Sequence, residues 1–369
     1  MSRSMGLKEF FMDACSPNCR VILIGSLPFD SHAEAVKTIF EFAPDFPVWP
    51  QLPMRSKEGM VRQFLSGMPG LVDREDRFFI DSGADGFETQ MAGFYESYFK
   101  ASDDDLFLKD SRFALEMDTA AGFFDMVNSL EHRNPKPVGI KGQVTGPVTT
   151  GIGVTDQRGR NIFFDDNLLD VMVKLLALKA KWQVLQLKPL GCEQAPMIFI
   201  DEPGIVSFGS SAYISISREM VMAALQEIID TIHQAGGLAG IHICANGDFS
   251  LVLESDTDAI SFDAYSYFDN LVLYKQQLLG FLEKGGMLAW GIVPTLDPEA
   301  VDMESTETLM ERFEMQLDTL IGFGVAGQAL LHQTFVAPAC GAGALTTDRA
   351  LKVLEMTRNI SQKIQYRIR

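Results

Sequence analysis

The chain has 369 residues, of which 47% are hydrophobic and 22% charged, a composition that excludes disordered and collagen-like proteins. Its 31 lysines and arginines against 49 aspartates and glutamates give a net charge of 31 − 49 = −18. A field of this sign repels polyanions at long range. We therefore expect neither nucleic acid nor an anionic membrane surface as a partner.

Cysteine usage and the N-terminal sequence bear on the cellular compartment. Five cysteines are too few, and odd in number, for a disulfide framework. The opening residues MSRSMGLKEFFMDAC lack the continuous apolar stretch of a signal peptide. The longest apolar helix candidate, Leu168–Leu187, is interrupted by three lysines and is not expected to cross a bilayer. We therefore expect a cytoplasmic protein with reduced thiols.

Short apolar runs alternate with longer amphipathic stretches along the chain. Eight runs are predicted to be strands: Arg20–Ile24, Arg77–Ile80, Pro137–Lys141, Met197–Ile200, Leu238–Ile243, Asp258–Phe262, Met287–Val293 and Gln328–His332. Nearly continuous apolar runs of this length are typical of parallel strands that are buried on both faces.

The stretches between these runs have the three-to-four-residue apolar period of helices. Predicted helices are Ala33–Phe42, Asn167–Leu187, Arg218–Gln234, Leu271–Glu283, Thr306–Phe323 and Thr347–Ile364. Ser305 is expected to be an N-cap, and glycine pairs at 236–237 and 285–286 are expected to end helices. The alternation predicts an α/β fold, a (β/α)₈ TIM barrel forming a single domain over residues 1–369, with extra helices within Asp81–Arg133 after the second strand.

Candidate metal ligands lie where the predicted strands end, the edge of a barrel at which active sites form. His242 and Cys244 are two residues apart, so their side chains point to the same side of a strand. Asp263 ends the next predicted strand, and Cys340 follows the last one. Imidazole and thiolate are preferred donors for Zn²⁺. The alternative is that the cysteines are small buried hydrophobes and the histidine a core residue, and spacing alone leaves both interpretations open.

Further polar candidates follow the fourth and first predicted strands. Asp201 and Glu202 are adjacent carboxylates after a buried run, and burying them is costly unless an ammonium, backbone N–H groups or a lysine satisfies them. An acidic residue before proline can also simply shape a loop. Ser26 is similarly open to two interpretations, hydrogen bonding to a substrate carboxylate or turning the chain.

Six short segments place these candidates in a fixed order along the chain. They are IGSLP (24–28), KGQVTGPV (141–148), FIDEP (199–203), HIC (242–244), DAISFD (258–263) and APACG (337–341). In this order they resemble the catalytic C-terminal barrel of cobalamin-independent methionine synthase. That barrel belongs to a superfamily shared with uroporphyrinogen decarboxylase and the methylcobamide:coenzyme M methyltransferases.

The resemblance implies a zinc site. The family's H-x-C motif falls on His242 and Cys244, and its late cysteine on Cys340, which would make these three residues zinc ligands. Methionine synthases of the family have a glutamate ligand where this chain has Asp263. The shorter side chain still offers oxygen, as a ligand or as a partner of one.

The resemblance also implies how an amino-acid acceptor would bind. The family's D-E-P aspartate falls on Asp201 and would bind the amino group of homocysteine. The serine of I-G-S-x-P falls on Ser26, which with the backbone around Ile24 would meet the carboxylate. The family's second amine-binding glutamate lies in a G-E-P segment that this chain lacks, which leaves Glu88 as a weak match.

The expected activity is that of a zinc-dependent thiol S-methyltransferase of the folate- or corrinoid-dependent homocysteine methyltransferase type. Full-length methionine synthases of the family carry a second barrel that helps hold polyglutamated methylfolate. The length and acidity of this chain lead us to expect a folate-independent relative whose donor is a methylcorrinoid on a separate corrinoid protein. The alternatives are a coenzyme M-type thiol methyltransferase, a decarboxylase of the uroporphyrinogen type and a non-catalytic barrel that binds zinc or a corrinoid.

Overall fold

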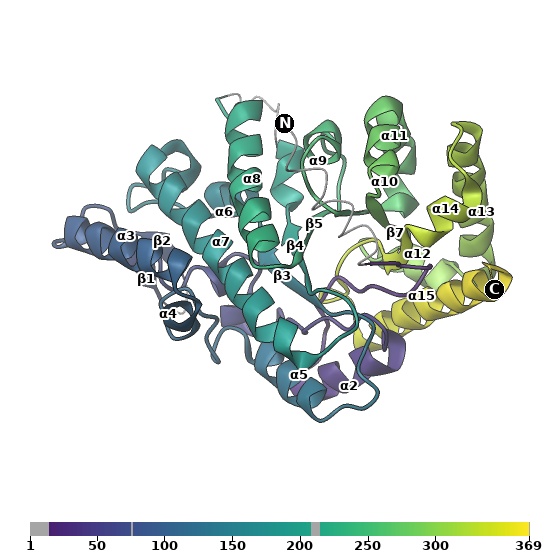
Figure 1. The fold of residues 1–369 in the computed structure, drawn as a ribbon, viewed down its shortest axis with the longest axis horizontal. Helices are drawn as coiled ribbons and strands as arrows, with labels where there is room; N and C mark the ends of the chain where they lie inside the picture. The colour runs from purple at the N-terminus through teal and green to yellow at the C-terminus, as the bar shows by residue number, and fades with distance from the viewer. Residues whose placement is uncertain (1–14, 75–76, 208–214, 369) are drawn as a thin grey trace.

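The computed structural model describes residues 15–74, 77–207 and 215–368 (Figure 1). Its main sheet has six parallel strands in sequence order. They are β3 (Lys141–Thr145), β4 (Met197–Asp201), β5 (Leu238–Ile243), β6 (Ala259–Phe262), β7 (Met287–Val293) and β8 (Thr334–Pro338). The predicted α/β class and parallel sheet are confirmed at this level.

Helices connect the consecutive strands and surround the sheet (Figure 1). They are α6 (Pro147–Gly153), α7 (Asp166–Leu187), α8 (Arg218–Gln234), α9 (Ser250–Leu253), α10 (Ala264–Leu271), α11 (Lys275–Glu283), α12 (Pro298–Met303), α13 (Thr306–Gly322), α14 (Gly327–His332) and α15 (Thr347–Ile368). Ser305 caps α13 in a capping box with Thr308, as predicted. Gly236 and Gly285 follow α8 and α11 with φ of +81° and +85°, the left-handed conformation that favours glycine at a helix end.

Two extended segments adjoin the outer strands of this sheet. Residues 20–26 form an isolated parallel bridge to β8 through Val21 and Val336. Residues 45–51 form another to β3 through Val48 and Lys141. The two segments also meet each other, since Ser26 bridges Gln51. The predicted strand Arg20–Ile24 is thus an extended segment with single bridges and not a regular strand.

The prediction that Arg77–Ile80 is the second strand of the main sheet is wrong. These residues form β2 (Phe78–Ile80), which pairs antiparallel with β1 (Leu71–Asp73) in a separate two-stranded sheet. The position beside β3 is taken by residues 45–51. The sequence did not predict a strand here because the segment contains Pro47 and Pro50, and proline lacks the N–H that a strand ladder uses.

Two further predicted strands are displaced along the sequence. The third strand is Lys141–Thr145 and not Pro137–Lys141. Its polar residues can lie in a buried strand because they have partners inside the fold: Gln143 donates to the Trp49 carbonyl, and Thr145 donates to the Met60 carbonyl. The predicted eighth strand, Gln328–His332, is the helix α14, and β8 follows it. A five-residue apolar run does not distinguish a short helix from a strand.

The extra helices expected within Asp81–Arg133 are present. They are α3 (Phe87–Asp103), α4 (Asp105–Lys109) and α5 (Ala121–Glu131), and α2 (His32–Phe42) precedes them. The α3 helix lies at one end of the molecule and packs against α7 (Figure 1). None of the described helices combines the length and the apolar composition that a bilayer crossing requires.

Buried apolar side chains fall into two clusters. The larger one lies between the sheet and the helices and includes Val144, Ile200 and Ile241. The smaller one takes alternate residues from the opposite face of the strands. Its members are Ile22, Phe46, Met197, Phe199, Leu238, Ala259, Met287, Ala289, Phe335 and Ala337. Because successive side chains of a strand point to opposite faces, the two clusters mark the two sides of the sheet.

Candidate metal centre at the carboxyl ends of the strands

Polar residues stand side by side where β3 to β6 end. Thr145 is in register with Asp201, Asp201 with His242, and His242 with Ser261. Residues in register on neighbouring parallel strands point to the same face, which here is the face of the smaller apolar cluster. The sheet therefore carries a row of polar side chains above an apolar interior.

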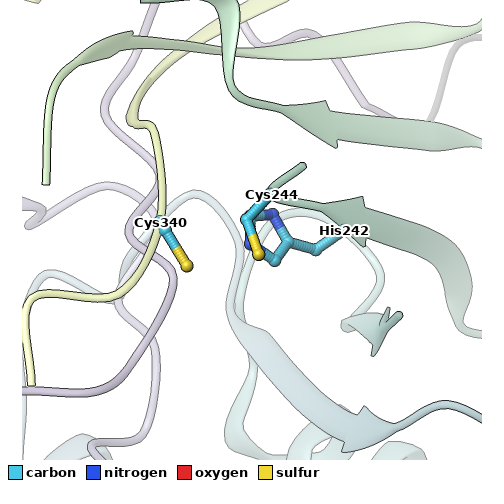
Figure 2. A group of neighbouring side chains, drawn as sticks. All are labelled: His242, Cys244 and Cys340. Carbon is cyan, nitrogen blue, oxygen red and sulfur yellow. The ribbon is translucent and has the colours of Figure 1, made fainter. Parts of the chain in front are cut away.

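A histidine and two cysteines converge at this edge. Cys244 follows β5 directly, and Cys340 lies in the segment after β8. One ligand atom each from His242, Cys244 and Cys340 lie within 4.8 Å of one another, so the three side chains could hold a metal ion. Figure 2 shows the Cys340 thiol pointing toward Cys244, with the imidazole of His242 beside it. The structure thus brings together three of the predicted ligands.

One ring nitrogen of His242 has a hydrogen-bond partner, and the other has none. Its side chain is 3% exposed, and Nδ1 lies 2.9 Å from the hydroxyl oxygen of Ser261. Nε2 is buried without a hydrogen-bond partner. If Nδ1 carries the proton and donates it to Ser261, Nε2 presents a lone pair, as a metal ligand must.

The two thiols lie close together, and their ionisations are linked. The adjacent Cys340 thiol and the nearby His242 lower the pKa of the Cys244 thiol against the opposing effect of burial. Proximity to Cys244 and burial raise the pKa of Cys340. A cation is therefore needed for both sulfurs to be thiolates at neutral pH.

Asp263 lies outside this group of three. It caps α10, where its Oδ1 accepts a hydrogen bond from the Ser266 backbone at 2.8 Å. Its Oδ2 is buried without a partner, and burial raises the pKa of the carboxyl. Asp263 thus keeps one free oxygen near the strand ends, and its role as a ligand stays a prediction.

The adjacent carboxylates Asp201 and Glu202 have different surroundings. Glu202 caps α6: its oxygens accept from the Val148 and Thr149 backbone at 2.7 and 2.9 Å and from the Thr149 hydroxyl at 2.7 Å. Asp201 is 5% exposed and its Oδ1 has no partner. Burial raises the pKa of both side chains, to about 7 for Glu202. Asp201 alone is therefore available to a ligand.

The segment around Ser26 lies against the Cys340 loop. The Ser26 carbonyl accepts from the Ala342 backbone at 3.0 Å, and a Cβ built on Gly341 would be 1.9 Å from the Ser26 hydroxyl. Only glycine therefore fits at 341 with Ser26 in this position. The carbonyl of Ile24 is already occupied by the Lys141 ammonium at 2.5 Å.

Other sequence candidates lie apart from the cluster. Glu88 is exposed in the first turn of α3, the helix at one end of the molecule (Figure 1). Cys19 is fully buried and its thiol donates to the Leu331 carbonyl. Cys15 and Cys192 are partly buried free thiols. The expected amine-binding role therefore falls on Asp201.

Sequence patterns did not indicate two residues that hold parts of this edge in place. Ser261 orients His242, and Lys141 reaches Ile24 from inside the sheet. Strand register would have indicated Ser261, since it occupies the position of the next strand that pairs with His242. Lys141 is the last residue of the predicted strand Pro137–Lys141, whereas the observed strand begins with it.

Comparison of the chain with protein-family models gave no match, and comparison with curated proteins gave none either.

Proposed function

We propose that the protein is a zinc-dependent methyltransferase that transfers a methyl group to a thiol acceptor, with homocysteine as acceptor and a methylcorrinoid as donor. The observation that carries this proposal is the convergence of His242, Cys244 and Cys340 within 4.8 Å at the carboxyl ends of the strands. The proposal includes membership of the methionine synthase-like superfamily and a closed (β/α)₈ barrel forming one catalytic domain.

Backbone pairing supports barrel closure. The segment 20–26 joins β8, the segment 45–51 joins β3, and the two segments join each other. In the proposed barrel, these two segments would complete a ring with the six regular strands. The smaller apolar cluster contains Ile22 from the segment 20–26 and Phe46 from the segment 45–51, together with residues of β4 to β8. Such a cluster is expected for side chains that fill a barrel interior.

The donor set supports zinc. A neutral imidazole nitrogen and two thiolates suit Zn²⁺, and three protein ligands with an open position are typical of catalytic zinc. The partnerless Nε2 of His242 and the partnerless Oδ2 of Asp263 are buried polar atoms that a cation would satisfy. A bound zinc ion would lower the pKa of an acceptor thiol so that it is a thiolate at neutral pH.

The remaining residues support an amino-acid acceptor. The unpaired carboxylate of Asp201 matches an ammonium group, and Ser26 offers a hydroxyl beside Cys340. Both would orient the acceptor so that its sulfur faces the methyl group. In the proposed reaction a sulfur–carbon bond forms while the bond from methyl to donor breaks, with its electron pair staying on the donor.

The charge of the chain supports a corrinoid donor over polyglutamated folate, because a net charge of −18 repels a polyanionic tail. It also disfavours a uroporphyrinogen-type substrate, whose many carboxylates need a cationic cleft.

The test combines metal analysis with an assay. We expect close to one zinc ion per purified chain and formation of methionine from methylcobalamin and homocysteine, measured by mass spectrometry. Coenzyme M and β-mercaptoethanol serve as competing acceptors. Zinc-loaded protein that methylates none of these thiols would leave only the non-catalytic alternative, and a chain that binds no zinc would refute the proposal.

A further inference from the structure

A lysine is buried on the interior face of the sheet, directly below the polar row. Lys141 is 1% exposed at the start of β3. It is four residues from Thr145, whose register partner is Asp201, so all three side chains share one face. Its ammonium lies 4.9 Å from the centre of the Phe199 ring, within the smaller apolar cluster. A cation in such surroundings is costly and calls for an explanation.

The Lys141 side chain connects β3 to the segment 20–26, which is not its neighbour in the sheet. The backbone N–H of Lys141 donates to the Pro47 carbonyl in the neighbouring segment 45–51. Its Nζ reaches past that segment and donates to the Ile24 carbonyl at 2.5 Å. The next residue, Gly25, has φ of +137°, which other residues rarely adopt. Lys141 therefore fixes the chain where it leaves the extended conformation and turns toward Ser26.

The segment that Lys141 binds also contacts the loop of the candidate metal centre. Ser26 follows two residues after Ile24 and packs against Gly341, next to Cys340. Its carbonyl also binds the Ala342 backbone. A shift of Ile24 would thus displace the Ser26 hydroxyl and weaken the hydrogen bond from the Ala342 amide to the Ser26 carbonyl.

Lys141 lies on the same face of the sheet as Asp201, and burial lowers the pKa of its ammonium to about 8, which leaves it charged at neutral pH. Among the charged groups that act on the Asp201 carboxyl, Lys141 has the largest effect in lowering its pKa, although burial raises the pKa overall. In the interior of a protein such a charge acts at several ångströms with little screening. The same ammonium lies under the Ile24–Ser26 segment, where the acceptor carboxylate is expected.

We propose that Lys141 is a positioning residue for an amino-acid acceptor: it holds the Ile24–Ser26 segment in place and supplies the buried positive charge that balances Asp201 and the acceptor carboxylate. This inference rests on the proposed function, because it assumes an acceptor that carries both an ammonium and a carboxylate. It assigns Lys141 no contact with the reacting atoms.

The test uses Lys141→Met in the full-length, zinc-loaded protein, with Lys179→Met as a matched control. Lys179 is also a fully buried lysine that donates to one carbonyl, that of Ala114, but it lies on the helix α7. Lys141→Gln, which keeps a polar side chain without the charge, replaces Lys141→Met if the latter does not fold. Three quantities are measured: zinc per chain, KM and kcat for homocysteine and for β-mercaptoethanol, and hydrogen exchange at the Ala342 amide.

For Lys141→Met we expect the KM and the calorimetric Kd for homocysteine to rise about 10- to 100-fold, the range for a lost interaction with a charged group. Zinc content and the KM for β-mercaptoethanol, which has neither ammonium nor carboxylate, should stay unchanged, and exchange at Ala342 should accelerate. Lys179→Met should change none of these. Equal weakening of both thiols, or wild-type homocysteine binding in Lys141→Met, would overturn the inference.

Failure of the proposed function gives a different result. If the zinc-loaded wild-type protein does not bind homocysteine, the proposed acceptor is wrong. Exchange at Ala342 then decides the positioning role: unchanged exchange in Lys141→Met overturns it, and faster exchange than in Lys179→Met supports it.

Discussion

Two regions of buried polar side chains differ in whether their hydrogen-bonding groups find partners. Around the segment 45–51, Trp49 donates to Gln183 at 2.9 Å, and Gln51 donates to Gln63 at 2.6 Å. Gln63 in turn donates to the Thr119 carbonyl. Each of these donors has a partner, so this region stabilises the fold.

The carboxyl ends of the strands show the opposite. Asp201, His242, Asp263 and Thr295 each keep a buried polar atom without a partner. Each such atom costs about 1–3 kcal/mol of folding free energy. Single buried atoms elsewhere also lack a partner, such as Thr150 Oγ1 and Gln194 Oε1, but at the strand ends four such atoms follow or end neighbouring strands, where an external ligand can satisfy them. The contrast predicts that substitutions at the strand ends affect binding, and that substitutions in the satisfied regions affect stability.

The largest expected effect follows removal of a ligand atom. In Cys340→Ala we expect zinc content to fall from about one ion per chain to near zero after dialysis. Zinc sites of four ligands are worth about 10–16 kcal/mol, so one ligand accounts for about 3 kcal/mol, or more than 100-fold in affinity. Metal per chain is measured by inductively coupled plasma mass spectrometry.

Cys192→Ala is the matched control for this prediction, because Cys192 is a partly buried free thiol outside the group of three. Zinc retention in Cys340→Ala equal to that in Cys192→Ala would show that the convergence of the two cysteines and the histidine does not bind metal.

A smaller effect is expected when the two adjacent carboxylates are compared. Asp201→Asn removes a carboxylate whose Oδ1 accepts no hydrogen bond in the fold, so the KM for homocysteine should rise about 10- to 100-fold, with a smaller loss of stability than in Glu202→Gln. Glu202→Gln should instead lower the free energy of unfolding by about 1–3 kcal/mol, because the amide nitrogen that replaces one oxygen cannot accept the bond from Val148 or from Thr149. Urea denaturation and steady-state kinetics separate the two outcomes. A loss of stability in Asp201→Asn without a change in KM would refute the division of roles.

The sequence predicted the parts of the site that lie on one strand or follow directly from strand order. His242 and Cys244 share a face because side chains alternate along β5, and that strand was predicted with its observed ends. The strands that were displaced or misplaced are those whose polar residues or prolines broke the apolar pattern. Gln143 and Thr145 in β3 and Pro47 beside it are examples, and their partners are 40 or more residues away in the chain.

Contacts between distant segments could not be predicted from the pattern. The meeting of Cys340 with Cys244 depends on how the segment after β8 returns over the strand ends. The different environments of Asp201 and Glu202 depend on the N-terminus of α6, which lies more than 50 residues before them. In both cases the local sequence specifies the chemical group, and the tertiary fold determines which group stays free.

The smallest expected effect concerns the hydroxyl that orients the imidazole. Ser261→Ala should weaken zinc binding about tenfold, because Nδ1 of His242 loses the partner that fixes the tautomer and the ring orientation. The comparison is Ser361→Ala, which removes another buried serine hydroxyl, one that donates to the Cys19 carbonyl at 2.7 Å. Both variants should lose about 0.5–1.5 kcal/mol of stability, but only Ser261→Ala should lose zinc affinity in competition with a fluorescent chelator. Equal zinc affinities in the two variants would mean that the imidazole is held by packing alone, and the hydroxyl would then belong with the satisfied groups of the fold and not with the site.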